Sequence, residues 1–433
     1  MAATAILEQL FNASDIAVVG NFTGAGKTVA VAAVGANSSI IALIVNLFVG
    51  IALGANVVIA NAIGRDDREA VKKAVHTSIV VAFLGGILVA VIGELAAVPL
   101  LHSLHVPDDV FDSALLYLRI YLLGMPVILL YNFEAAIFRS VGETKIPLIA
   151  LFVSGILNVA LNLFFVAVLR MTVNGVAIAT VISNAVSSVL LLRRLRVSKQ
   201  YIHVQWQSLR IDRTAFGQIM KIGLPAGIQS AVFAVSNIVI QSAINSLGTV
   251  VMAASSAAYN IEIFAYDVLN SFSQACTTFV GQNFGAGQIK RCKRTLLLCL
   301  IASAAAIALV LFAGKHLLAI FNNDPEVISI GYTRLLMVFS AYTFSMLYEV
   351  MSGYLRGFGI SLVPALLTTI GVCGIRIGWI HFVFPQSRTF QTIMTAYPVS
   401  LSATALLILI ALLCYRPSRR FANLQQKEET PHE

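Results

Sequence analysis

The stretch Phe138-Arg139-Ser140-Val141-Gly142, followed by Pro147, returns 217 residues later as Leu355-Arg356-Gly357-Phe358-Gly359, followed by Pro364. In both places an arginine precedes a glycine by three residues, and a proline follows that glycine after five. Landmarks that recur in the same order at a fixed distance are the sequence signature of an internal repeat. The stretch therefore predicts a chain built from two similar halves.

Two further pairs of motifs extend the repeat. Asn61-Ala62-Ile63-Gly64 resembles Gln282-Asn283-Phe284-Gly285 at a shift of 221 residues, and Val106-Pro107-Asp108 resembles Asp324-Pro325-Glu326 at a shift of 218. The nearly constant shift predicts two six-helix halves, which share one orientation because six spans is an even number. The boundaries that we expect are an N-lobe over 1–195, a linker over 196–217, a C-lobe over 218–416 and a tail over 417–433.

Composition places both halves in a membrane. Of the 433 residues, 58% are hydrophobic and 11% charged, and the mean hydropathy is +0.86, whereas soluble domains carry about 25% charged residues. A bilayer core needs roughly 20 apolar residues per helix. Segments of that kind lie near 2–24, 29–60, 74–101, 113–140, 145–168, 172–195, 218–247, 252–282, 293–321, 329–357, 362–385 and 390–415. We predict an all-α membrane protein with about twelve transmembrane helices in two lobes around a central cavity.

The basic residues indicate the orientation of the chain. Most of the 29 lysines and arginines fall in the loops 64–73, 139–145, 193–221 and 290–294 and in the C-terminal tail. Cytoplasmic loops carry such an excess, so we expect a plasma-membrane protein with both termini in the cytoplasm and with membrane lipids as partners. The net charge of +9 is then a topology signal, and we expect no nucleic-acid partner. The five cysteines show no metal-binding or disulfide spacing, and we expect no bound cofactor.

Asp15 is the charge in the first apolar segment. A carboxylate inside a membrane helix costs a few kcal/mol or more, so such residues are rare and usually functional. On a helix of 3.6 residues per turn, Glu8, Asn12 and Asp15 share one face. That face is predicted to point at protein or water, because lipid offers it no hydrogen bonds.

Several of these features together resemble one transporter family. Gln282-Asn283-Phe284-Gly285-Ala286 after the eighth segment, the paired Arg-x-x-Gly landmarks and the basic central linker resemble the multidrug and toxic compound extrusion (MATE) family, over essentially the whole chain. Within it, we expect the DinF-like branch. The resemblance implies export of organic, often cationic and aromatic compounds in exchange for inward Na⁺ or H⁺.

The start of the chain departs from the family pattern. Family members usually have an amphipathic lead-in before the first helix, and the second half has one in residues 216–225, ending at Pro225. The counterpart of Pro225 in the first half is Ala3, so most of the lead-in would precede Met1. We expect a short or clipped N-terminus.

The resemblance also implies a cation site in the N-lobe, and its positions fall on Asp15, Asn158, Asn162 and Thr180. The residue types support that set, because hard cations such as Na⁺ prefer carboxylate, amide and hydroxyl oxygens. Asp15 could instead bind a proton. The alternative interpretation is that these polar residues only hold membrane helices together, as asparagine and threonine often do.

The repeat provides an internal control. The counterparts of Asp15, Asn158, Asn162 and Thr180 in the second half are Asn237, Ile375, Trp379 and Tyr397. The second half thus has no carboxylate and little ligand chemistry at the equivalent places. Residues that only hold helices together should recur in both halves, so the asymmetry favours a single coupling site in the N-lobe.

Other acids inside the predicted spans are candidates for substrate binding. Glu262 lies near Tyr259 and Tyr266, which suits a cationic aromatic compound through charge and cation–π contact. Asp267 and, in the fourth segment, Glu134 are further candidates, although each acid could equally be an ion-paired structural residue. Arg334, Arg376 and His381 are interpreted as structural partners or as side chains that snorkel toward water.

These features predict a monomeric secondary antiporter, not an enzyme, that exports small organic compounds by alternating access. The first alternative is a flippase for a lipid-linked precursor, which would need several lysines or arginines in its cavity, whereas most candidates here are acidic or neutral. A membrane enzyme or receptor without transport activity is the other alternative.

Overall fold

A computed structural model describes residues 1–22, 27–103, 106–198, 200–247, 249–321 and 325–421. The described chain is helical, and none of its residues forms a β-strand. The longer helices are α1 (Ala2–Phe22), α2 (Lys27–Gly64), α3 (Arg68–Ser103), α4 (Asp108–Leu123), α5 (Met125–Ser140), α6 (Lys145–Leu163), α7 (Val173–Val197), α8 (Arg213–Asn245), α9 (Thr249–Gly285), α10 (Ile289–Phe321), α11 (Pro325–Gly357) and α14 (Phe390–Tyr415). Shorter helical pieces are η2 (Phe164–Val168), η3 (Trp206–Ser208), α12 (Leu362–Thr368), η4 (Thr369–Gly374), α13 (Ile375–Gly378), η5 (Trp379–Val383) and η6 (Phe384–Gln386).

Each of the twelve predicted segments coincides with a helix or with a run of adjoining helical pieces. Seven described stretches are long and apolar enough to cross a membrane, and the bent pair α4–α5 makes an eighth. The predicted class, an all-α membrane protein, is confirmed. One segment expected to be a single helix is bent, and two others contain π-helical turns. The segment over 113–140 bends by 51° between α4 and α5. The segment over 145–168 contains η2, and the segment over 362–385 contains η4 and η5.

The bend between α4 and α5 has a local cause. Gly124 separates the two helices, and Pro126 stands in the first turn of α5, where its missing N–H costs no helical hydrogen bond. A Cβ atom on Gly124 would collide with the side chain of Val181 in α7. The glycine therefore lets the bend lie directly against α7.

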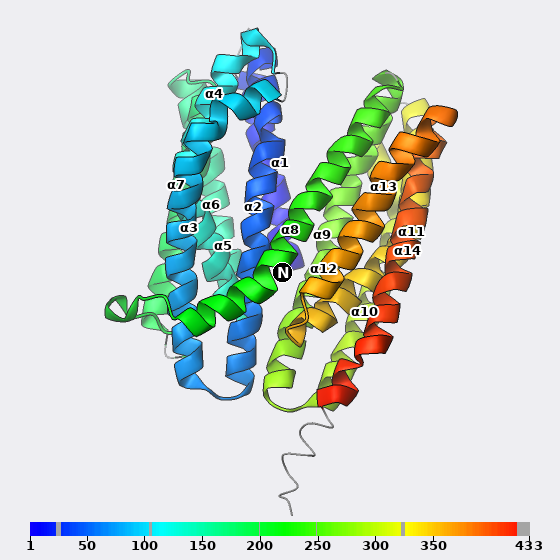
Figure 1. The fold of residues 1–433 in the computed structure, drawn as a ribbon. Helices are drawn as coiled ribbons and strands as arrows, with labels where there is room; N and C mark the ends of the chain where they lie inside the picture. The colour runs from blue at the N-terminus through cyan, green and yellow to red at the C-terminus, as the bar shows by residue number, and fades with distance from the viewer. Residues whose placement is uncertain (23–26, 104–105, 199, 248, 322–324, 422–433) are drawn as a thin grey trace, which may run out of the picture. The chain divides into compact units, whose positions relative to one another are not determined.

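The described chain divides into two compact units. One comprises residues 6–59 and 67–220, where α3 packs on α4 and α5, and α7 packs on α4, α5 and α6 (Figure 1). The other comprises residues 1–5, 60–66 and 221–433, where α11 packs on α9, α10 and α14. Each unit has an apolar core, which buries Leu118 and Met125 in the first and Tyr348 and Ile393 in the second.

Candidate functional site

A contact between an aromatic ring and a glycine positions α1 on α6. The ring of Phe11 occupies the space in which a side chain on Gly155 would lie. Asp15 follows Phe11 by one helical turn, and Asn158 and Asn162 follow Gly155 by one and two turns. The close approach at the glycine therefore brings the acid of α1 opposite the two amides of α6.

Asp15 is buried and accepts hydrogen bonds at both carboxylate oxygens. Asn162 Nδ2 in α6 donates to Asp15 Oδ1 over 2.5 Å, and Thr180 Oγ1 in α7 donates to Asp15 Oδ2 over 3.2 Å. Both donors come from helices other than α1. A carboxylate that would be costly in an apolar environment is thus held by two polar groups of its own unit.

The second amide connects the remaining members of the set. Asn158 Oδ1 accepts from Asn162 Nδ2 over 3.1 Å. Asn158 Nδ2 donates to the hydroxyls of Thr180 and Ser183, over 3.4 Å in each case. The structure thus brings all four predicted cation-site residues together. It adds Ser183, which the sequence reasoning missed although it lies one turn after Thr180.

A separate hydroxyl pair fastens α6 to α7 beside this cluster. Ser187 Oγ lies 2.5 Å from Ser154 Oγ and 3.3 Å from the carbonyl oxygen of Ala150. Ser154 lies on the same helical face as Asn158 and Asn162, but among the described residues its hydrogen-bond partners are Leu151 and Ser187, not Asp15. Its observed role is to join two helices.

The four residues offer the oxygen chemistry that a hard monovalent cation needs. Asn162 Oδ1 is buried and accepts no hydrogen bond within the described part of the chain. That free amide oxygen lies on the residue that also contacts the carboxylate of Asp15. Asp15 is the only acid of the four, so the set can carry a single negative charge. No group of three or more His, Cys, Asp or Glu side chains that could hold a metal ion occurs among the described residues.

The predicted substrate-binding residues are spread over two units. Glu134 in α5 belongs to the unit of Asp15, is completely buried, and neither of its carboxylate oxygens has a hydrogen-bond partner among the described side chains. Glu262, Tyr266 and Asp267 lie in α9 of the other unit, where Glu262 is buried and the other two are half-buried. Tyr259 also lies in α9, but its side chain is outside the described residues.

Tyr266 takes part in a row of side chains that the sequence reasoning did not identify. Its hydroxyl lies 3.4 Å from Glu349 Oε1 in α11, and its ring stacks on Phe233 in α8 with centroids 6.0 Å apart. On Phe233 in turn lies the guanidinium of Arg376, with its Cζ atom 5.4 Å from the ring centroid. Only 2% of Arg376 is exposed. Of the two expectations for this arginine, the burial fits a structural partner and contradicts a side chain that snorkels toward water. The side chain of Arg334 lies outside the described residues.

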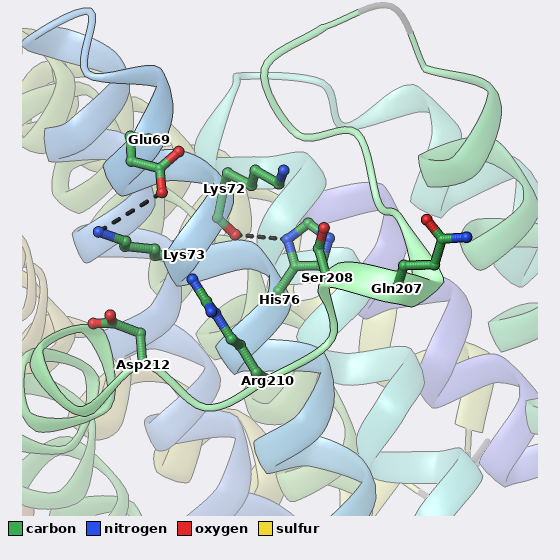
Figure 2. A pocket seen from close by; sticks show the side chains of 8 residues that line it. All are labelled: Glu69, Lys72, Lys73, His76, Gln207, Ser208, Arg210 and Asp212. Carbon is green, nitrogen blue, oxygen red and sulfur yellow. Dashed lines mark hydrogen bonds and ion pairs between the residues drawn. The ribbon is translucent and has the colours of Figure 1, made fainter.

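A hollow of about 200 Å³ lies elsewhere, between the start of α3 and the linker before α8 (Figure 2). Its lining carries both signs of charge, from Lys72, Lys73 and Arg210 and from Glu69 and Asp212. None of the predicted site residues lines it. His76 also lines the hollow and joins the linker to α3, because His76 Nε2 accepts from the backbone N–H of Gln205 over 3.0 Å.

A buried acid held by polar side chains inside a polytopic helical protein is typical of membrane transporters. Comparison with known proteins identifies the family to which the chain belongs. The family model described as MatE matches residues 1–164 and 225–380, and the chain belongs to this family of multidrug efflux transporters.

Curated relatives and solved structures agree with this assignment. The chain is 25% identical to the probable multidrug resistance protein YoeA of Bacillus subtilis, over 88% of this chain and 84% of that protein. It is 24% identical to the probable multidrug resistance protein NorM of Thermotoga maritima, over 86% of this chain and 81% of that protein. A crystal structure of MATE in the bent conformation matches 99% of this chain and 95% of its own, with a TM-score of 0.86 at 19% identity. The fold is therefore the MATE fold.

Proposed function

We propose that this protein is a secondary antiporter of the cell membrane that exports organic, cationic or amphipathic compounds in exchange for Na⁺ or H⁺. The family supports a role in multidrug export. One observation carries the coupling: the buried Asp15 carboxylate of α1 is held by an amide of α6 and a hydroxyl of α7. Both termini face the cytoplasm in this proposal, the transporter acts as a monomer, and it performs no covalent chemistry on its substrate.

The hydrogen bond that the Thr180 hydroxyl donates depends on whether an ion is bound at Asp15. Its hydroxyl has one hydrogen but two acceptors, Asp15 Oδ2 at 3.2 Å and the carbonyl oxygen of Val176 at 2.9 Å. A bound proton or cation neutralises Asp15 and weakens the attraction of its carboxylate for that hydrogen. The hydroxyl then donates to Val176 within its own helix, and one tie between α1 and α7 is lost.

Loss of that tie links ion binding to helix packing. A ligand can shift a conformational equilibrium only by as much as its affinity differs between the states. Here the difference arises because α1 is tied to α7 when Asp15 is charged and released when it is neutralised. Ion and exported compound then favour different states of the transporter, which is the requirement for exchange.

Na⁺ and H⁺ use the site differently. For Na⁺, Asp15, Asn158, Asn162 and Thr180 supply oxygen ligands, and the unpartnered Oδ1 of Asn162 is available as one of them. For H⁺, Asp15 alone takes the ion, and the neighbouring side chains rearrange their hydrogen bonds around the neutral carboxyl group. The flippase alternative is less favoured, because the relatives compared above are named as multidrug resistance proteins.

Ethidium accumulation in cells that express the protein tests the proposal. Wild-type protein should lower accumulation in energised cells, and Asp15→Asn should abolish this effect while the protein still reaches the membrane. Glu94→Gln is the matched control, because Glu94 is another acid of a membrane helix but forms an ion pair with Arg119, at 3.4 Å. Unchanged export in Asp15→Asn cells would refute the role of this residue.

A further inference from the structure

The second unit holds a buried cation that nothing described so far employs. Arg376 in α13 is 2% exposed, and its guanidinium lies between two aromatic rings, with Cζ 4.3 Å from the centroid of Tyr397 and 5.4 Å from that of Phe233. Its Nε donates to Ser400 Oγ over 3.1 Å. This is the only one of its five N–H donors that forms a hydrogen bond within the described chain.

Among the described side chains, the charge of Arg376 has no partner of opposite sign at close range. The ion pairs found among the described side chains are Lys73–Glu69 and Arg119–Glu94, so no described carboxylate oxygen lies within 4.0 Å of the guanidinium. Cation–π contact with two rings compensates part of the cost of removing the charge from water. A buried arginine inside a membrane protein is nevertheless costly and usually marks a ligand pathway or a bound counter-ion.

Arg376 contacts a place that the internal repeat relates to the surroundings of Asp15. At the shift of 217 residues, Thr180 and Ser183 in α7 correspond to Tyr397 and Ser400 in α14. The local geometry corresponds too: Ser183 Oγ donates to the Thr180 carbonyl over 3.0 Å, and Ser400 Oγ donates to the Tyr397 carbonyl over 3.1 Å. Arg376 therefore contacts the counterparts of two residues that surround Asp15.

The charges of the two repeat-related places are opposite. In the first half, neutral polar groups surround a carboxylate. In the second half, the counterpart of Asp15 is the neutral Asn237, and a guanidinium lies on the equivalents of Thr180 and Ser183. If the guanidinium of Arg376 permanently replaced the cation that Asp15 binds in the first half, an acid would be expected at position 237 to pair with it. Because position 237 carries no acid, the N–H groups of Arg376 that form no hydrogen bond within the described chain are available to an external anion.

We propose that Arg376 binds the carboxylate of exported zwitterionic aromatic compounds, so that the second unit contains an anion subsite. A guanidinium presents paired N–H groups that match the two oxygens of a carboxylate. The stacked rings of Phe233 and Tyr266 continue from the guanidinium and offer an aromatic surface to the rest of such a compound. At the far end of this row, Glu349 accepts from the Tyr266 hydroxyl and supplies the negative charge that an amine or iminium group would face.

This inference rests on the proposed export function, and a matched pair of dyes tests it separately. Rhodamine 110 carries a free carboxylate, and rhodamine 123 is its methyl ester and is purely cationic. Wild-type protein in proteoliposomes should export both dyes. Arg376→Gln should lower export of rhodamine 110 at least about tenfold, equivalent to ~1.4 kcal/mol, and leave export of rhodamine 123 within about twofold.

Arg376→Lys guards against a purely structural effect, because it keeps the charge and should retain part of the rhodamine 110 export. Fluorescence polarisation of each dye with the purified variants measures binding directly and should show the same selective loss. An equal loss of both dyes in both variants, or no loss of either, would overturn the anion subsite. If wild-type protein exports neither dye, the proposed function and this inference both fail. If both dyes are exported and substitution of Arg376 changes neither rate, only this inference fails.

Discussion

The ring of Phe11 in α1 fills the space beside Gly155 in α6 that any larger residue would occupy. This contact lies one turn before the place where Asp15 meets the amides of Asn158 and Asn162. The position of the charged group thus depends on an apolar contact with no ionic chemistry of its own.

Gly155→Ala should displace α1. The added methyl group overlaps the Phe11 ring, and overpacking of this kind costs about 1–3 kcal/mol. We expect a lower midpoint of thermal unfolding in detergent and weaker coupled export. Gly217→Ala is the control, because a Cβ atom there meets nothing within 4 Å. A variant at position 155 as stable and active as that control would contradict the role of the contact.

Asn162→Leu should uncouple transport without unfolding the protein. The change removes the 2.5 Å donor to Asp15 Oδ1 and an amide oxygen of the proposed ion site. The charge-assisted bond contributes roughly 1.5–3 kcal/mol, so gradient-driven export should fall at least about tenfold.

Ser154→Ala is the control for Asn162→Leu. It removes a buried polar group of the same helical face that contacts Ser187 and not Asp15. Export by this variant should stay near wild type, with a stability loss of about 1 kcal/mol. An equal loss of export in both variants would contradict the role of Asn162 in coupling.

His76→Phe should loosen the linker that precedes α8. His76 Nδ1 lies 2.7 Å from the Lys72 carbonyl, and its Nε2 accepts from the Gln205 N–H (Figure 2 shows the contact with Lys72). The phenylalanine leaves both backbone groups without this partner, at a cost of about 1–3 kcal/mol. Trypsin should therefore cleave the linker faster. Lys73→Ala, which removes only an exposed ion pair with Glu69, should leave cleavage at the linker close to that of wild type.

Gly64→Ala should disturb the end of α2. A Cβ atom on Gly64 would collide with the backbone of Gln282 and Ala286, and one on Gly285 would collide with the backbone of Asn61. We expect a lower unfolding midpoint for Gly64→Ala. On the same helix, Gly35→Ala has open space around it and should be neutral or should stabilise the helix by ~0.5–1 kcal/mol. An unchanged unfolding midpoint for Gly64→Ala would show that the backbone at position 64 can move away from that of Gln282 and Ala286 at little cost.

The sequence predicts most of the fold because the membrane limits the choice of structures. An apolar segment of sufficient length has to form a helix, and the repeat landmarks identify the halves. The pair of motifs ending in Gly64 and Gly285 also proves to be a packing contact, which explains why both carry glycine. The bend between α4 and α5 was not predicted, although Gly124 and Pro126 stand at it in the sequence. The packing of Gly124 against Val181 joins helices distant in sequence and is seen only in the structure.

The candidate site was predictable only in part. The helical spacing of Ser154, Asn158 and Asn162 places them on one face, and the structure buries all three. The order of the hydrogen bonds, with Asn162 between Asp15 and Asn158, depends on side-chain orientation and cannot be read from spacing. For Arg376 the sequence left two interpretations open, a structural partner or a side chain that snorkels toward water, because hydropathy does not distinguish an arginine that reaches water from one enclosed by two aromatic rings.

The most direct test of the coupling site is dye export from proteoliposomes under a sodium gradient and a proton gradient, each imposed alone, with wild type and Asp15→Asn. Wild-type protein should export ethidium under at least one gradient, and that gradient identifies the ion. Asp15→Asn should export none under either gradient, while it still binds the dye. Gradient-driven export by Asp15→Asn at the wild-type rate would contradict the claim that this carboxylate couples the ion to transport.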